Sequence, residues 1–420
     1  MRMPSASGQS SYNMKTMFAS IGLVAVGASS LHAEYAPGLT AGERTKLVTV
    51  SGSLRGFYDD NYTTQSSGTN ALSSWGIEAS PSISLNKVTS MTLFKASAVY
   101  DLKHYVTPNI NDQTVQVSGL IDHKFTESQS LKVKDEFVVA QESAILDPVA
   151  QSTPLRTKGS NIRNSALADY LADLNKLLQV ELTYNANVYH YQDKAYQPLL
   201  DRLEQLAGAD LRFKFTPTVT GVLGYHYGDN SYSDKLIGTS NVEGSIRDNR
   251  SHFGLAGVDV KVSKDLSASL RVGAQFFDYY NLHKTQVSPY ADGSLTYRYA
   301  DASYFQAGVK HLHNATDLIG NVADPVLDVE ATVVYLQLTQ PLTFISPDLT
   351  AGVYGSFQHS VFNKGVLDGQ SEDFYSASGT LAYRVNPNLS IETGYNYDEA
   401  SSSVRPFTRN RVYLGFRASY

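Results

Sequence analysis

Ser251 and His252 come closest to a catalytic pair, because a serine becomes a nucleophile only beside a base that takes its proton. The two residues are neighbours in the chain. On a β-strand, neighbouring side chains point to opposite faces, which would separate the hydroxyl from the imidazole. The ten histidines are scattered along the sequence. We therefore predict no catalytic residues, and a hydrolase is the least favoured alternative.

Other site chemistries find equally little support. The chain has no cysteine, which excludes disulfides, thiolate metal sites and cysteine nucleophiles. Asp59, Asp60 and Asn61 carry oxygens that suit Ca²⁺, but three such neighbours after a strand more often form a turn. No HExxH motif and no Gly-rich phosphate loop before a helix occurs. We predict no metal and no cofactor, and the net charge of -6, without blocks of like charge, argues against a nucleic-acid partner.

The pattern that dominates the chain is alternation of apolar and polar residues over segments of about ten positions, from Leu47 onward. In residues 73–86 and 266–276, every second residue is mostly apolar and the residues between are mostly polar. A period of two predicts strands with one face in lipid and one in water. After the N-terminal region, no run approaches the roughly 18 to 20 apolar residues that a spanning helix needs. The 28 tyrosines suit a barrel with aromatic rings at two membrane interfaces.

Tight turns near residues 87, 127, 217, 264, 301 and 387 alternate with longer polar stretches. A single-chain barrel needs an even number of strands, and residues 163–174 decide the count. Their Ala, Leu and Asp content favours a helix, whereas closure of the barrel requires a strand. We therefore predict an all-β, transmembrane, antiparallel up-and-down barrel of about 18 strands over residues 47–420. Its short turns are expected to be periplasmic and its longer loops extracellular.

The N-terminal region is typical of an export signal. Lys15 supplies a positive charge, Met17 to Gly27 an apolar core, and Ala28 to Ala33 a small-residue cleavage region. We predict a signal peptide over residues 1–33, with Met14 as an alternative start, and a periplasmic segment over residues 34–46. A short buried helix is the less favoured alternative.

The C-terminus is the most specific feature. Val412, Leu414, Phe416, Ala418 and Tyr420 form an apolar face that ends on an aromatic residue. This pattern resembles the terminal signal by which outer-membrane proteins are recognised by their assembly machinery. The resemblance implies a location in the bacterial outer membrane, with outer-membrane lipid and the barrel assembly machinery as partners.

Several longer segments resemble the bacterial Putative beta-barrel porin 2 family, and the similarity spans most of residues 47–420. The segments that carry it are FYDDNY at 57–62, LTYNANVYHY, LRFKFTPTVTGVLGYHYGDNSY, the SH of 251–252 and YADGSLTYRY. The resemblance implies a membrane barrel with a pore. It brings no catalytic residues and does not identify a solute.

A barrel of this strand number encloses more space than side chains can fill, so we predict passive diffusion of small hydrophilic solutes. The candidate pore-lining residues are Arg55, Lys95, Lys103, Lys132, Lys134, Glu136, Glu181, Arg212, Lys214, Arg271, Arg298, Arg384, Arg411 and Arg417. Cations outnumber anions among the water-facing positions, which would give a mild preference for anions. The favoured alternative is a salt-bridged wall with little bias.

The third external loop, residues 142–161, carries Glu142, Asp147, Arg156 and Lys158. If the loop folds inward, these four residues would flank a constriction, but most long external loops cover the mouth or stay mobile. A plugged structural or surface-binding barrel is therefore the main rival to a porin. The sequence leaves a homo-oligomer open.

Overall fold

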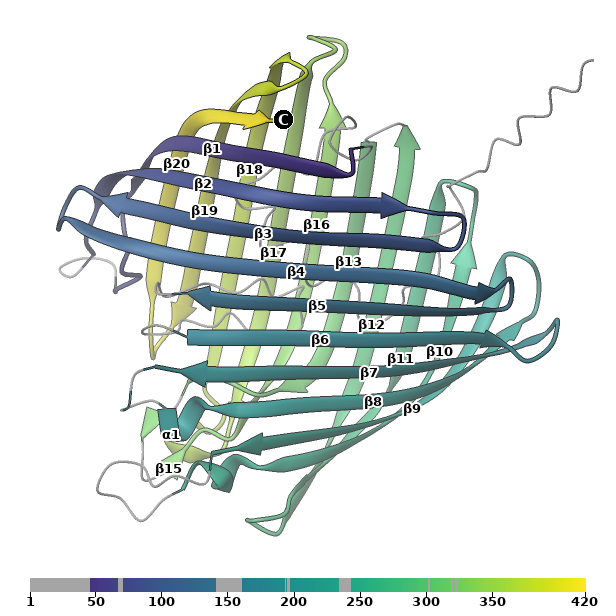
Figure 1. The fold of residues 1–420 in the computed structure, drawn as a ribbon. Coiled ribbons are helices and arrows are strands. Elements are labelled where there is room, and N and C mark those ends of the chain that lie inside the picture. The colour runs from purple at the N-terminus through teal and green to yellow at the C-terminus, as the bar shows by residue number, and fades with distance from the viewer. Residues whose placement is uncertain are drawn as a thin grey trace, which may run out of the picture.

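The computed structural model describes residues 46–66, 71–140, 161–192, 194, 197–233, 243–300, 303–318, 320–321 and 324–420. Within this part of the chain, eighteen strands form one antiparallel sheet, which closes on itself because β1 pairs with both β2 and β20. In Figure 1, β1 to β9 form the front wall of the barrel and β10 to β19 lie behind them. The predicted count of about 18 strands is confirmed.

The barrel strands follow the chain in order around the ring. Their bounds are β1 Val48–Asp59, β2 Ser74–Val88, β3 Thr92–Tyr105, β4 Ile110–Thr126, β5 Gln129–Ala140, β6 Asn161–Asp173, β7 Leu178–Tyr191, β8 Arg202–Lys214, β9 Val219–Tyr232, β10 Asn249–Lys261, β11 Leu266–Tyr279, β12 Lys284–Ala300, β13 Ser303–Asn314, β16 Asp328–Pro341, β17 Leu349–Asn363, β18 Ser371–Asn386, β19 Leu389–Ser402 and β20 Phe407–Ser419. The connections contain α1 Gln197–Leu200, η3 Gly244–Arg247, η4 Gly365–Leu367 and a small hairpin of β14 Gly320–Asn321 and β15 Asp324–Pro325. No helix in the described ranges is long and apolar enough to cross a membrane.

Residues 161–173 form a strand, as the strand count requires, and not the helix that their composition favours. β6 pairs along its whole length with β5 and with β7. Two continuous ladders satisfy its backbone groups from both sides, and this tertiary pairing overrides a helix preference of a few tenths of a kcal/mol per residue. The turn after β6 is fixed by Asn175, whose side-chain oxygen accepts hydrogen bonds from the backbone N–H groups of Leu177 and Leu178.

The connections divide the barrel into two ends, which we call the turn end and the loop end. The predicted turns near residues 87, 127, 217, 264 and 387 connect strands at the turn end, while residues 301–302 lie outside the described ranges. The loop end carries the long connections 60–73, 192–201, 233–248 and 315–327. Both ends of the barrel sheet, at Val48 and Ser419, lie at the turn end.

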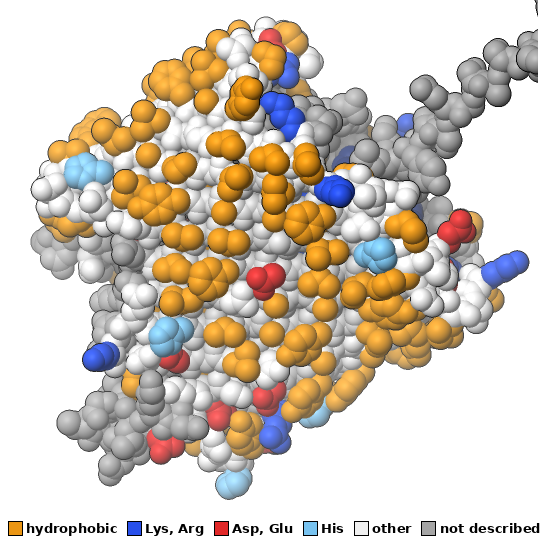
Figure 2. Space-filling view, viewed as in Figure 1, with side chains coloured by type: hydrophobic (Ala, Val, Ile, Leu, Met, Phe, Trp, Pro, Cys, Tyr) orange, Lys and Arg blue, Asp and Glu red, His pale blue; other side chains and the backbone are white. Residues whose placement is uncertain are grey.

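The outer face of the wall is apolar. On β11, Leu270 and Val272 are about half exposed, whereas Arg271 between them is buried, so the predicted alternation is confirmed. Figure 2 shows hydrophobic side chains spread over the outer face of the front wall, with few charged ones among them. Exposed apolar surface of this extent is costly in water and is the normal surface of a barrel in lipid.

The regular wall has one irregularity, between β12 and β13. These strands pair only from Ala291 with His311 to Ala300 with Ser303, and residues 284–290 of β12 pair with β11 alone. Pro289 in this stretch has no N–H to donate to a ladder. The backbone of His313 instead bonds the side chain of Gln275 on β11, through its N–H at 3.2 Å and its C=O at 3.5 Å. The loop-end part of the β13–β16 pair therefore lies against the inner face of β11.

Candidate pore and its loop-end cap

All fourteen predicted pore-lining residues lie on the inner, polar face of their strands. They are Arg55, Lys95, Lys103, Lys132, Lys134, Glu136, Glu181, Arg212, Lys214, Arg271, Arg298, Arg384, Arg411 and Arg417. Many of them form ion pairs inside the barrel. Those in ion pairs are Arg55, Lys103, Glu181, Arg212, Lys214, Arg271, Arg384 and Arg411. That they line a conducting pore remains a prediction.

The first cluster of ion pairs spans the closing seam of the barrel. Arg55 on β1 donates one hydrogen bond of 2.8 Å to Glu78 on β2 and one of 2.9 Å to Glu392 on β19. Its side chain therefore passes over β20, where Gly415 is its register partner. A Cβ atom at Gly415 would lie 2.6 Å from Arg55 Cγ and 2.3 Å from the carbonyl oxygen of Leu54. Glycine at this position thus makes room for the guanidinium.

A second cluster lies on the wall of β7 to β11. Arg212 donates to Glu181 and to Asp259, both at 2.6 Å, and Arg271 donates to the same Asp259 at 2.9 Å. One carboxylate therefore serves two guanidinium groups. Gly257, the register partner of Arg271, again leaves room, because a Cβ there would lie 2.5 Å from Arg271 Cδ. These pairs neutralise much of the cationic excess that the sequence suggested.

The opposite part of the lumen wall has a different character. The inner face of β17 bears hydroxyl, amide, aromatic and glycine residues and no charged group. Ser356, Gln358 and Ser360 lie in its middle, and all three are buried. The described part of the lumen therefore combines a charged wall with a neutral, polar wall. Counting cations along the sequence did not predict this division.

Three long loop-end connections meet across the mouth of the barrel. Arg202 at the start of β8 donates a 2.7 Å hydrogen bond to Asp317, which also accepts a hydrogen bond from the hydroxyl of Tyr191. Asp317 lies in the connection between β13 and β16, so this contact bridges strands that are far apart on the ring. Arg247 of η3 is fully buried and donates to the carbonyl oxygens of Leu199 and Thr316. We call residues 315–318, held in this way, the strap.

Further contacts pack the β13–β16 connection, which contains the strap, and the neighbouring loop-end connections against the barrel wall. Val326, Val329, Phe362 and Leu367 form a buried apolar cluster beside the strap, and Val404 from the last connection packs against it. Asp59 at the end of β1 accepts hydrogen bonds from both Arg409 and Arg411 of β20. Arg405 makes a bidentate pair with Glu372. The described loops thus form a cap over part of the loop end, which both ion pairs and apolar contacts hold together.

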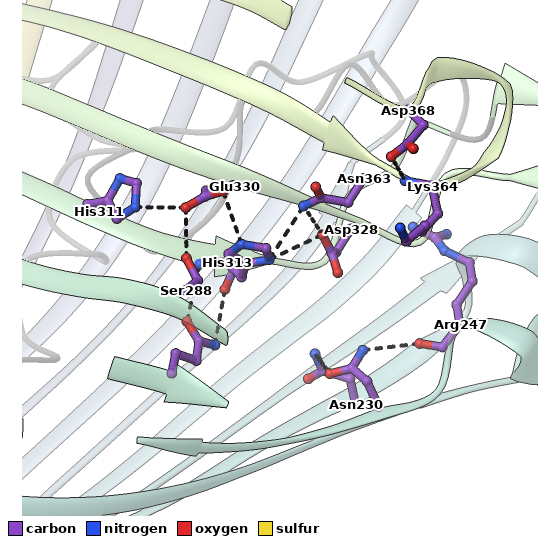
Figure 3. A network of polar contacts seen from close by, with 12 residues as sticks. Asn230, Arg247, Ser288, His311, His313, Asp328, Glu330, Asn363, Lys364 and Asp368 are labelled. Carbon is purple, nitrogen blue, oxygen red and sulfur yellow. Dashed lines mark hydrogen bonds and ion pairs between the residues drawn. The ribbon is translucent and has the colours of Figure 1, made fainter. Parts of the chain in front are cut away.

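A polar network surrounds His313 beneath this cap (Figure 3). The two ring nitrogens of His313 each lie 3.3 Å from a carboxylate, Nδ1 from Asp328 and Nε2 from Glu330. Glu330 also accepts a 2.7 Å hydrogen bond from Ser288 and lies 3.0 Å from His311 Nε2. No group of His, Asp and Glu in the described residues has the arrangement of a metal site. The network joins β12 to the β13–β16 pair beyond the point where the β12–β13 backbone ladder ends, which gives it a structural role.

Tyr280, in the connection between β11 and β12, belongs to the same end of the barrel. Its hydroxyl donates a 3.2 Å hydrogen bond to Asp248 beside η3. Burial, followed by the nearby Asp248 carboxylate, raises the pKa of Tyr280 to about 12. The hydroxyl therefore stays protonated at neutral pH and remains a donor to that carboxylate.

A pocket of about 550 Å³ lies at the turn end, on the inner side of the wall between β6 and β12. Arg212, Lys214, Lys261 and Arg298 contribute to its lining, together with Lys176 from the turn after β6. Asp259 is the one carboxylate among its lining residues. This pocket could not be predicted from the sequence, because its residues come from seven strands and two turns.

The remaining predicted residues have different outcomes. Glu142, Asp147, Arg156 and Lys158 of the third external loop lie outside the described residues, as do residues 1–45 with the expected signal peptide. Ser251 is buried on the inner face of β10, whereas His252 is exposed on the outer face and contacts Tyr225, so the pair is separated as expected. Leu414 and Phe416 are exposed on the outer face of β20, and Tyr420 follows its last residue.

The fold and the two faces of its wall define the class of protein. A closed antiparallel barrel with an apolar exterior and a polar, ion-paired interior is a transmembrane β-barrel. Residues 36–420 match the family described as Putative beta-barrel porin 2. The chain therefore belongs to this family of barrels of the bacterial outer membrane. In such barrels the short turns are periplasmic and the longer loops extracellular.

Solved structures that are similar to this chain include two proteins of Pseudomonas aeruginosa and one of Acinetobacter baumannii. OpdL from P. aeruginosa is 13% identical, with a TM-score of 0.43, over 89% of this chain and 99% of that one. OccK2 (OpdF) in complex with glucuronate is 11% identical, with a TM-score of 0.42, over 89% and 98%. OccAB4 from A. baumannii is 10% identical, with a TM-score of 0.42, over 91% and 100%. A search of curated proteins found no match.

Proposed function

We propose that this barrel is a water-filled pore through which small hydrophilic solutes diffuse passively across the outer membrane, without catalysis. The observation that carries the proposal is the inner face of the closed barrel, which presents charged and hydroxyl side chains around the whole ring. Polar and charged lining groups in a wide barrel lower the cost of moving a hydrated solute across the bilayer. The capped loop end would restrict passage to small solutes.

We further propose that the pore has weak charge selectivity, with a mild preference for anions. The ion pairs of Arg55, Arg212 and Arg271 compensate their charges, which supports weak selectivity. Lys132 and Lys134, adjacent on the inner face of β5, favour anions over cations.

The decisive test is single-channel conductance of the refolded mature chain in a planar bilayer under a salt gradient. We expect stable conductance steps and a small reversal potential whose sign shows that anions permeate more readily than cations. A barrel that inserts and folds but carries no current would contradict the pore. That outcome would favour a capped barrel that binds a partner at the cell surface, a candidate supported by the strap and its buried contact between Arg202 and Asp317.

We also propose how the chain is exported and assembled in the outer membrane. Residues 1–33, with Met14 as an alternative start, would direct export, and residues 34–46 would lie in the periplasm. The barrel assembly machinery would then recognise the last strand by its outer apolar residues and Tyr420. Mass spectrometry of the mature N-terminus tests the cleavage after Ala33.

A further inference from the structure

The turn-end pocket is a concave feature of the described wall that the general pore proposal does not use. It is open to the lumen and holds about 550 Å³, which falls within the usual range for a small-molecule site. Its cationic residues come from β8, β10, β12 and the turn after β6, so the closed barrel brings them together. In the membrane this pocket faces the periplasmic mouth.

The charges of the pocket are not balanced. Arg212 is compensated by Glu181 and Asp259, and Lys214 forms a 2.5 Å ion pair with Asp173. Lys176 and Lys261 also line the pocket, and neither forms an ion pair with any residue in the described ranges. Their ammonium groups therefore give the pocket a positive potential.

Neutral hydrogen-bonding groups surround these cations. Ser269 on β11 and Ser294 on β12 share a 2.9 Å hydrogen bond at the pocket wall. Further hydroxyl groups come from Thr218, Thr220, Ser267 and Thr296. Hydroxyl groups can donate to and accept from the hydroxyls of a polar solute, while ammonium groups bind an oxyanion.

We propose that this pocket is a binding site for a small polyhydroxylated solute that carries one carboxylate or phosphate group. Lys176 and Lys261 bind the oxyanion, and the serine and threonine hydroxyls contact the remainder of the solute. The site holds the solute at the periplasmic mouth, on its way out of the pore. This inference rests on the proposed pore function and adds the solute class and its place of binding.

The test is block of ionic current by glucose 6-phosphate and by gluconate, each compared with uncharged glucose. Since the chain has no cysteine, one introduced at Glu127 in the β4–β5 turn reports, through an impermeant thiol reagent, which side the turns face. We expect at least one of the two anions to block at lower concentration from the turn side than from the loop side. Glucose should block from neither side at the same concentration.

Three variants make the test specific to the pocket. Lys176→Ala with Lys261→Ala should weaken block from the turn side about fivefold, the usual effect of removing solvent-accessible charge contacts. Lys264→Ala is the matched control, because Lys264 lies at the same end, is 90% exposed and does not line the pocket. Asp259→Asn should strengthen block, since it removes the one carboxylate of the lining.

The outcomes separate this proposal from the pore function on which it rests. A barrel without any conductance contradicts the pore itself. An open pore that neither anion blocks, or that both block equally from the two sides, refutes the pocket while leaving the pore intact. Equal weakening of block by the double variant and by Lys264→Ala also refutes it, because the effect would then be a general change in surface charge.

Discussion

The guanidinium of Arg55 donates a 2.9 Å hydrogen bond to Glu392, which lies 337 residues further along the chain. Because β1 and β20 are the first and last strands of the barrel, this contact spans the seam that closes the sheet. The nine register pairs of the seam are fewer than the twelve between β1 and β2. The buried ion pair therefore adds side-chain contacts where the backbone ladder is short.

Replacing Arg55 with Met should destabilise the barrel strongly, because Glu78 and Glu392 would keep buried carboxylates without their partner. Breaking a buried pair in this way costs about 3–5 kcal/mol. Urea unfolding of the barrel in lipid vesicles measures the loss. Adding Glu78→Gln and Glu392→Gln to Arg55→Met should recover most of the stability, since no uncompensated charge remains. Equal stability of the wild type and the single variant would show that the seam does not depend on the pair.

Gly415→Ala should also destabilise the seam, because its Cβ would lie 2.3 Å from the Leu54 carbonyl oxygen, which is part of the backbone. Overpacking of this kind costs about 1–3 kcal/mol. Gly56→Ala is the matched control, since Gly56 is on β1 and a Cβ there meets nothing within 4 Å. The comparison uses the midpoint of urea unfolding. A larger loss in the Gly56 variant would contradict the packing argument.

The barrel could be predicted from the sequence because every strand follows the same local pattern of alternating apolar and polar residues. Alternation of Leu270, Arg271 and Val272 places one residue in the lumen and two in lipid. The even strand count predicted a strand over residues 163–174 against their propensity, and the structure has it at 161–173. Loop contacts follow no such rule. Arg202 and Asp317 lie 115 residues apart in segments without periodicity, so nothing local indicates that they meet.

The partners of the charged residues could not be predicted from the sequence either. Periodicity placed Arg212 and Arg271 on the inner face, but the register between neighbouring strands decides which carboxylate each one reaches. Asp259 contacts both because β10 lies between β9 and β11 and the side chains cross neighbouring strands. Such pairing weakens the charge bias that a count of cations along the sequence predicts.

Tyr420→Ala should lower the amount of barrel assembled in the outer membrane of intact cells, because the terminal aromatic residue would be lost from the assembly signal. The folded barrel should change little, since Tyr420 is 82% exposed and its backbone hydrogen bonds with Val50 do not require the ring. Heat-modifiable migration on gels reports the assembled fraction in cells, and urea unfolding reports stability after refolding in vitro. An equal loss in both measurements would assign Tyr420 to stability and not to recognition.

Asp317→Asn should loosen the strap at the loop end and raise the conductance of the pore. The substitution keeps the size of the side chain but removes the charge that Arg202 contacts within a fully buried pair. With the carboxylate gone, Arg202 retains Glu204 at 2.6 Å as a partner, so the wall should stay intact while residues 315–318 detach. Single-channel recording measures the conductance, and limited proteolysis measures access to the strap.

Arg250→Ala is the control for this last prediction, because Arg250 is half exposed on the outer face and its pair with Asp229 has no contact with the strap. We expect Arg250→Ala to leave conductance and proteolysis unchanged. If Asp317→Asn made the strap accessible to protease without changing the conductance, the strap would not limit the pore. The restriction on solute size would then have to come from the lumen wall, where the β13–β16 pair lies against β11 and Gln275 holds the backbone of His313.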